Sequence, residues 1–164
     1  MSDSTLLHSV SAFLYREAEY VDARRWDDWL ALFDPQAEYW MPSWDSEYEY
    51  TSDPQTEVSL MYYGNRTGLE DRVFRLRTGR SAASTPLPRS CHLVSNVQAA
   101  PNADGSCAVK ANFVTHLFRN NATQSFYGHY EYLLAPQGGS WIIRKKKIIV
   151  LNDLIDTVLD IYSV

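Results

Sequence analysis

The residues best suited to acid–base or metal chemistry in this 164-residue chain are four histidines: His8, His92, His116 and His129. The last three lie in segments with the alternating pattern of β-strands, where a sheet could bring them together. A mononuclear iron site needs two histidines and a carboxylate on one side of the metal. The spacing of these histidines fixes no such set, so we expect hydrogen-bonded histidines rather than metal ligands.

Acid–base catalysis without a cofactor needs titratable side chains that meet in a pocket. A curved sheet covered by helices can enclose such a pocket, where Asp22 would meet His92 or a tyrosine. Each residue also has a structural role open to it: Asp22 can cap a helix, and His92 can pack in the core or at an interface. The sequence favours these structural roles and leaves the catalytic one open as an alternative.

The two cysteines do not match an iron–sulfur site. A Rieske cluster takes two thiolates and two imidazoles from paired C-x-H and C-x-x-H segments. Cys91 and His92 are direct neighbours, and Cys107 has no histidine at either spacing. We therefore expect no such cluster in this chain, and we predict that both cysteines are small buried residues without a disulfide. The chain also has no P-loop, dinucleotide fingerprint, G-x-S-x-G or H-E-x-x-H motif.

Charge is unevenly distributed along the chain, whose net charge is −5. Residues 1–60 hold three cations and thirteen acids, whereas residues 61–90 hold six arginines and two acids. A pI near 5.3 argues against a protein that follows nucleic-acid phosphates, because such proteins present an uncompensated basic surface. We therefore expect the arginines of 61–90 to take part in contacts between segments of the chain or between subunits: Arg66, Arg72, Arg75, Arg77, Arg80 and Arg89.

A second basic run, RKKK at 144–147, lies in a segment with strand-like composition. Alternate residues of a strand point to opposite faces, so the four cations do not form one patch. We expect this run at a solvated or subunit-facing edge of the sheet.

Two helices are expected near the N-terminus. Apolar residues recur at helical spacing through 5–21, behind the capping candidates Asp3 and Ser4. A shorter helix would follow, capped by Asp22 and closed by Asp-Pro at 34–35. Its predicted apolar stripe consists of Trp26, Trp29, Leu30 and Phe33.

The middle of the chain mixes strands, a loop and a helix. Segments 37–42 and 58–64 are predicted strands, and the acidic, aromatic segment 43–57 between them is predicted to be a long loop. Residues 68–77 have the pattern of a helix, followed by an irregular arm at 78–89 that we expect to grip a neighbouring molecule.

The predicted helix at 68–77 has a recognisable start and a defined inner face. Thr67 and Glu70 have the spacing of a capping box, in which each side chain satisfies a free amide at the helix end. Phe74 lies away from the apolar stripe, so it is expected to point outward. The stripe and a predicted i,i+4 ion pair are Leu69, Val73 and Leu76, and Asp71 with Arg75.

From residue 90 onward, the alternation predicts four antiparallel strands: 91–99, 107–119, 125–135 and 141–151. The last residues are predicted to form a docked tail. Helices followed by strands indicate an α+β fold in one domain, residues 1–164. No apolar run is long enough for a membrane span, and the N-terminus lacks a signal-peptide pattern, so we expect a cytoplasmic protein.

Six segments stand in a characteristic order and spacing: RRWDDWLALF (24–33), YWMP (39–42), NRTGLEDRVFRLRTGRSAASTPLPRS (65–90), FYGHYEYLL (126–134), WIIRKKKIIVLND (141–153) and LDIY (159–162). Together they resemble the small, or β, subunit of Rieske-type aromatic ring-hydroxylating dioxygenases. Within that family the chain is most similar to the subunits of enzymes that act on anthranilate, benzoate and halobenzoates. The resemblance covers almost the whole chain.

The resemblance implies a cone of the cystatin-like or nuclear transport factor 2-like type, with a strongly curved, mainly antiparallel sheet covered by N-terminal helices. It also implies a non-catalytic structural subunit in an α3β3 hexamer that dihydroxylates an aromatic carboxylate. The Rieske [2Fe–2S] cluster and mononuclear Fe(II) would then lie in the large subunit, and electrons would come from NADH through a reductase. This chain itself would have no catalytic, cofactor or metal site, and no nucleic acid or membrane partner.

The resemblance further implies that the arginine-rich helix and arm contact sister small subunits and the large subunit. Arginine suits that role because it forms forked hydrogen bonds with carboxylates and stacks on aromatic rings. The expected interface residues are Arg66, Arg72, Phe74, Arg75, Arg77, Arg80 and Arg89. Their expected complements, in this subunit or the next, are Trp44, Asp45, Glu47, Tyr48 and Glu49 of the acidic loop. Arg72→Glu or Arg75→Glu would then loosen the hexamer more than it unfolds the domain.

Two other function classes remain open from the residues alone. The first is a stand-alone dehydratase or isomerase of the same cone fold, which would use an Asp, His or Tyr in its pocket. The second is a small-ligand binding module, whose pocket would lack a reactive pair.

Overall fold

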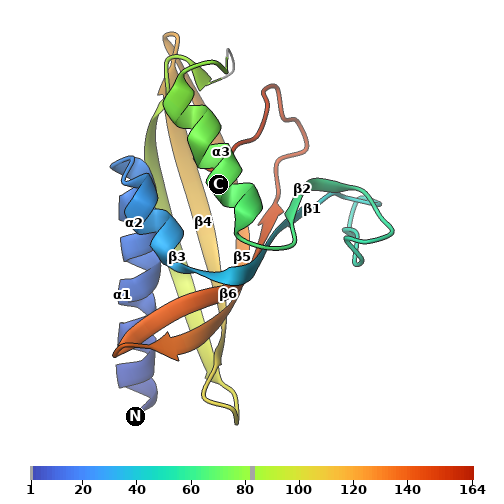
Figure 1. Ribbon diagram of the computed structural model, residues 1–164. Coiled ribbons are helices and arrows are strands. Elements are labelled where there is room, and N and C mark those ends of the chain that lie inside the picture. Colours follow the sequence, from blue (N-terminus) through green and yellow to red (C-terminus); the bar gives the residue numbers. More distant parts are fainter. Residues whose placement is uncertain (1, 82–83) are drawn as a thin grey trace.

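A curved six-stranded sheet carries helices against its buried face in the computed structural model, which describes residues 2–81 and 84–164 (Figure 1). The elements follow in the order α1 (Asp3–Asp22), α2 (Trp26–Ala31), β1 (Phe33–Pro42), β2 (Ser59–Tyr63), α3 (Thr67–Thr78), β3 (Arg89–Pro101), β4 (Cys107–Arg119), β5 (Ala122–Gln137) and β6 (Ser140–Val150). This order confirms the predicted α+β class, including all four strands after residue 90.

The strand order across the sheet is β2-β1-β6-β5-β4-β3. Strands β3, β4, β5 and β6 pair antiparallel in sequence order, and so do β1 and β2, whereas β1 runs parallel to β6. The sheet is therefore mainly antiparallel, as predicted. The expectation that RKKK at 144–147 lies at a sheet edge is wrong, because β6 has β1 on one side and β5 on the other.

The core lies between the helices and one face of the sheet. Along β4 and β5 the buried residues alternate with exposed ones, and His116 and His129 are on the exposed side, as predicted. The helices contribute an apolar stripe each, and the largest fully buried side chains include Trp29, Phe13 and Phe113. Two aromatic rings, Phe113 and Tyr130, stack with centroids 4.4 Å apart and planes at 9°.

The predicted N-terminal helix is present, but both of its expected boundary residues differ. Its N-cap is Ser2 rather than Asp3 or Ser4: the Ser2 hydroxyl accepts a hydrogen bond from the Thr5 amide at 3.3 Å. Asp22 does not cap the second helix, because it is the last residue of α1. Its carboxylate is instead engaged by β3, since Ser90 and the His92 amide both donate to it.

The second helix is shorter than predicted. It ends at Ala31, and Phe33 begins β1 instead of completing the helical stripe. The Phe33 ring still packs on Trp29, with centroids 4.9 Å apart, so the tryptophan stripe extends into the strand. The early end has a tertiary cause, because the Leu32 carbonyl accepts a hydrogen bond from the Ile143 amide of β6 at 2.8 Å.

Helix α3 buries the predicted stripe and turns Phe74 outward, where it is 70% exposed. The predicted capping box is not formed. The Glu70 carboxylate accepts from Arg66 Nε at 2.8 Å, and the Thr67 amide donates to Asn65 Oδ1 at 3.0 Å. The predicted Asp71–Arg75 ion pair is also absent from the part of the chain that the structure describes, so both side chains are free to face outward.

The irregular segments take the places that the sequence indicates. Segment 43–57 is a projecting loop with one isolated bridge, Trp44 to Tyr50 (Figure 1). The arm at 78–89 lacks strand and α-helix from Gly79 to Pro88 within the described residues, with 82–83 outside them. The tail at 151–164 is docked, as predicted: its last five residues, 160–164, are buried.

Gly128 in β5 is required by a close backbone approach. A Cβ at this position would lie 1.8 Å from the Ile149 carbonyl oxygen of β6. We expect Gly128→Ala to destabilise the fold by about 3 kcal/mol or more, because main chain rather than a flexible side chain must move. Urea unfolding of both proteins measures this difference.

Gly64→Ala is the matched control, since its Cβ would meet only the Tyr62 side chain, at 3.6 Å or more. Its free energy of unfolding should stay within about 1 kcal/mol of the parent. Equal stabilities of the Gly128→Ala and Gly64→Ala variants would contradict the β5–β6 register.

Candidate functional site

A buried ion pair lies inside the cone, between α1 and β6. Lys146 Nζ is 2.6 and 2.9 Å from the two carboxylate oxygens of Glu17, and the Tyr132 hydroxyl donates to the same carboxylate at 2.9 Å. The two charged side chains are only 5% and 3% exposed. Burial lowers the pKa of Lys146, and the attraction of Glu17 and its hydrogen bonds act in the opposite direction.

Tyrosine rings surround this ammonium group. Lys146 Nζ lies 4.5 Å from the ring centroid of Tyr130, 5.4 Å from that of Tyr132 and 6.0 Å from that of Tyr39, distances at which cation–π attraction operates. Burial, followed by the charge of Glu17, raises the pKa of all three hydroxyls well above its ordinary value. The tyrosines therefore remain neutral, and none of them is poised to act as a base.

The second polar group is Asp22 with His92, the pair that the enzyme alternative requires. His92 Nδ1 is 2.6 Å from Asp22 Oδ1, and His92 Nε2 is 3.1 Å from the Val164 oxygen. The His92 side chain is 2% exposed. Both ring nitrogens face acceptors, so only the imidazolium form can donate to both.

Asp22 is held as a carboxylate. Partial burial raises its pKa, but hydrogen bonds and attraction from His92, with a hydrogen bond from Ser90, outweigh that effect and lower the pKa overall. The pair thus joins the end of α1 to β3 and to the docked tail. Asp22 and His92 are thus in contact, as the enzyme alternative requires. Their hydrogen bonds, however, connect parts of the chain to one another.

The space between these groups is too small for a substrate. Their shared cavity has a volume of about 10 Å³ and is lined by Glu17, His92, Tyr130, Tyr132 and Lys146 together with apolar residues of α1, Val94 and Val164. A cavity of this size holds about one water, whereas small-molecule sites usually occupy about 300–1,000 Å³. The acid–base groups therefore form a packed cluster rather than an open active site.

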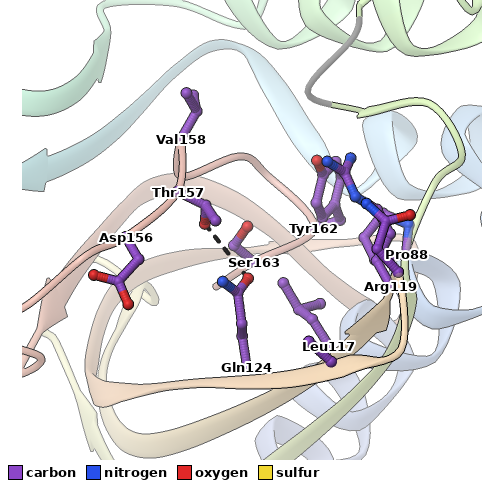
Figure 2. A pocket seen from close by; sticks show the side chains of 11 residues that line it. Pro88, Leu117, Arg119, Gln124, Asp156, Thr157, Val158, Tyr162 and Ser163 are labelled. Atoms are coloured by element: carbon purple, nitrogen blue, oxygen red, sulfur yellow. Dashed lines mark hydrogen bonds between the residues drawn. The ribbon is translucent and has the colours of Figure 1, made fainter.

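The roomier pockets lie elsewhere on the surface. One of about 440 Å³ opens between the β4–β5 turn and the tail, where Thr157 Oγ1 lies 3.5 Å from Gln124 Oε1 (Figure 2). Its lining has one carboxylate, Asp156, and one guanidinium, Arg119. Another, of about 540 Å³, lies near the start of α1 and the β5–β6 turn. Neither includes the Asp22–His92 pair or the buried ion pair.

The metal-ligating residue types are dispersed. Across residues 2–81 and 84–164, no group of three or more His, Cys, Asp or Glu side chains could hold a metal ion. Cys91 and Cys107 are both free thiols. Cys107 is buried, as predicted, whereas Cys91 is exposed because it occupies the outward side of β3.

Several of the arginines predicted at an interface are bound within the chain. Arg66 donates to Glu70 and, at 2.9 Å, to the Phe33 carbonyl. Arg72 forms a forked ion pair with Asp160, in which the guanidinium is 14% exposed and the carboxylate 1%. This pair ties α3 to the tail, and Ser84 and Tyr162 continue the same hydrogen-bonded group.

The remaining predicted interface residues lie further out. Arg77 pairs with Asp27 at 2.9 Å, and Arg89 lies over the Phe118 ring at 4.8 Å. Arg75 and Arg80 are exposed. In the acidic loop, Trp44 Nε1 donates to the Val150 carbonyl at 2.8 Å, whereas Tyr48 is 82% exposed.

Sequence reasoning missed Glu17 and Lys146. Glu17 lies on the buried stripe of α1 with Val10, Phe13 and Leu14, at the spacing of an apolar residue. A lone carboxylate at such a position signals a buried cation elsewhere, because an unpaired buried charge is too costly. The alternation of β6 then selects Lys146 from the basic run, since its neighbours Lys145 and Lys147 face the other side.

The architecture defines a class of protein first. A putative scytalone dehydratase from Novosphingobium aromaticivorans superposes with a TM-score of 0.69 over 98% of this chain and 97% of that one, at 12% identity. At that identity the likeness shows the fold alone. The chain thus has the cone of the nuclear transport factor 2-like class, as its resemblance to a known family implied.

Within that class the sequence is specific. Residues 16–157 match the ring hydroxylating beta subunit family. Toluate 1,2-dioxygenase subunit beta from Pseudomonas putida is 42% identical over 95% of this chain and 96% of the relative. Anthranilate 1,2-dioxygenase small subunit from Acinetobacter baylyi is 44% identical over 95% of this chain and 96% of the relative. The chain belongs to this family, the small subunits of aromatic ring-hydroxylating dioxygenases, which are oxidoreductases.

Solved structures agree with the sequence comparison. The crystal structure of the beta subunit of benzoate 1,2-dioxygenase from Burkholderia mallei has a TM-score of 0.81 over 96% of this chain and 97% of that chain, at 36% identity. Separately, no helix in the described residues is long and apolar enough to cross a membrane.

Arg72→Ala tests the α3–tail ion pair. The substitution leaves the Asp160 carboxylate buried without its cation, so we expect a loss of about 3–5 kcal/mol in the free energy of unfolding. Arg75→Ala, on the exposed side of the same helix, should cost less than about 0.5 kcal/mol. Urea unfolding compares the two. A loss below about 1 kcal/mol for Arg72→Ala would contradict a stabilising Arg72–Asp160 ion pair. Because Arg72 is bound within the chain, Arg75 is the arginine whose substitution is expected to loosen assembly without unfolding the domain.

Asp22→Asn tests the Asp22–His92 link through pH. Because folding lowers the pKa of Asp22, its stabilising effect is complete above the ordinary carboxyl pKa of about 4 and is lost as the pH falls below it. The parent should therefore lose free energy of unfolding more steeply than Asp22→Asn between about pH 5 and pH 2. Urea unfolding at a series of pH values measures both slopes, and parallel slopes would contradict the link.

Proposed function

We propose that this chain is the structural, non-catalytic subunit of a multicomponent dioxygenase that dihydroxylates an aromatic carboxylate. One observation carries the proposal: its acid–base groups surround a cavity of only about 10 Å³. A substrate ring and dioxygen have no room there. Chemistry on such a substrate therefore needs a second protein component.

That component is the large subunit of the same enzyme. The relatives are named as beta or small subunits of dioxygenases, which supports a partner of this kind. We infer an α3β3 hexamer, in which three copies of this chain support three large subunits. Exposed arginines and Phe74 on α3, and exposed aromatic residues on the acidic loop, would supply contact surfaces for such an assembly.

The names of the relatives support a proposal for the substrate class. Those at 41–44% identity are named for toluate, benzoate, anthranilate and 2-halobenzoate, all of them aromatic carboxylates. We therefore propose an aromatic acid of this group as the substrate of the whole enzyme.

The cofactors belong to the partner components in this proposal. The Rieske cluster and mononuclear iron of the large subunit would supply electron transfer and oxygen activation, with NADH as the electron source through a reductase. The described residues of this chain do not fit either group, because they contain no cluster of three metal-ligating side chains. In this proposal, the residues of this chain bind neighbouring subunits and hold the assembly together.

The observation that favours a stand-alone acid–base enzyme is the Asp22–His92 contact of 2.6 Å. Its ring nitrogens are both occupied, and the adjoining cavity is filled by packed side chains. This alternative would need a rearrangement that opens the cone.

Co-expression with a large subunit of the same dioxygenase family tests the proposal. We expect the isolated chain to be colourless, without stoichiometric iron and without turnover, and the co-purified complex to contain iron and to oxidise an aromatic acid with NADH and reductase. Metal analysis and product detection are the readouts. Asp22→Asn should leave turnover per assembled complex unchanged, because Asp22 has only a structural role. Stoichiometric iron or turnover in the lone chain, or loss of turnover in an intact Asp22→Asn complex, would overturn it.

A further inference from the structure

We propose that the outward face of α3 is a docking surface for the acidic loop 43–57 of a second copy of this chain. The inference rests on the proposed function, because it supplies the contact by which small subunits would join one another.

The docking surface has an apolar centre with cationic flanks. Helix α3 buries Leu69, Val73 and Leu76, which turns Phe74 to the outside, where it is 70% exposed. Arg75 and Arg77 follow on either side of Phe74 on the helix, and Arg80 lies just beyond its end. An exposed aromatic ring flanked by guanidinium groups is typical of interface hot spots.

Few of these cations are neutralised by the chain itself. Arg77 contacts Asp27, but both side chains are largely exposed, at 48% and 82%. Within residues 2–81 and 84–164, neither Arg75 nor Arg80 forms an ion pair. The face is therefore available to an anionic partner.

The acidic loop has the complementary composition. Segment 43–57 contains no lysine or arginine and five carboxylates: Asp45, Glu47, Glu49, Asp53 and Glu57. None of the ion pairs in the described residues involves this loop. Carboxylates are ionised at neutral pH, and hydrogen bonds from backbone amides lower the pKa of Asp53 and Glu57 further. Its tip presents Tyr48, which is 82% exposed.

One copy does not bring these two surfaces together. In Figure 1 the loop projects to the right of the sheet, whereas the C-terminal end of α3, which carries Arg75 and Arg77, points to the top of the view. Unlike surfaces at different places on one molecule form heterologous contacts, which give a ring when the rotation from one copy to the next closes. The loop of each copy would meet α3 of the next, and three copies would complete the ring of the proposed hexamer.

Opposite charges and an aromatic contact would make different contributions to binding at this interface. The carboxylates and guanidinium groups set orientation and association rate, and their attraction weakens as salt rises. Tyr48 and Phe74 supply the apolar area that opposes dissociation. Contact between copies should therefore depend on both salt and these two rings.

Charge exchange within the chain tests the contact in the purified complex. Arg75→Glu with Arg80→Glu, and separately Glu47→Arg with Glu49→Arg, should each weaken contact between small subunits at least about tenfold by opposing like charges. All four changes in one chain should restore it, because every interface is again complementary. Native mass spectrometry and sedimentation at several salt concentrations measure assembly. Arg16→Glu with Glu19→Arg, on the exposed side of α1, is the matched control and should assemble like the parent.

A crosslink identifies the occupant. Tyr48→Cys with Phe74→Cys, in a Cys91→Ser background, should give disulfide-linked multimers of the small subunit when the complex is oxidised. Crosslinks to the large subunit instead, or no rescue by the fourfold exchange, would overturn the inference. If all variants assemble normally while iron and turnover remain in the complex, only this inference fails. A chain that never binds the large subunit would remove the proposed function as well.

Discussion

The ion pair between Glu17 and Lys146 is the interaction on which the interior of this protein depends. It joins α1 to β6, and the Glu17 carboxylate also accepts a hydrogen bond from the Tyr132 hydroxyl of β5. Neither charge is stable alone in so dry a place, so each fixes the position of the other. The ion pair and the three tyrosine rings around it fill the space between the helices and the sheet, so that only a cavity of about 10 Å³ remains there.

This packing leaves no substrate-sized space around the acid–base groups. The Asp22–His92 pair would suit acid–base chemistry in an open cone, yet here His92 bridges α1 to the backbone of the docked tail. The ion pair between Arg72 and Asp160 binds the same tail to α3. In both contacts, side chains of a kind used in acid–base chemistry are bound to other parts of the same chain and hold the tail in place.

The sequence predicted the elements better than their ends. The strands after residue 90 and the stripe of α3 followed from periodicity, since burial on one face imposes it. The errors at Asp22 and Phe33 come from partners distant in sequence, since Asp22 accepts from β3 and β1 pairs with β6 from Phe33 onward, whereas Glu70 pairs locally with Arg66. Capping patterns describe local choices, and tertiary hydrogen bonds or ion pairs override them when they are worth as much.

The sequence by itself determined the α+β class, the family and the uneven charge, because periodicity, motif order and composition are properties of the chain. Only the tertiary structure decided which charges are used internally. It selected Lys146 from four adjacent cations and Arg72 from six arginines, and it left Arg75 and Arg80 at the surface. The reason is that a charge is assigned to the core or the surface by the neighbours that folding brings within a few ångströms, and those neighbours lie 88 and 129 residues away along the chain.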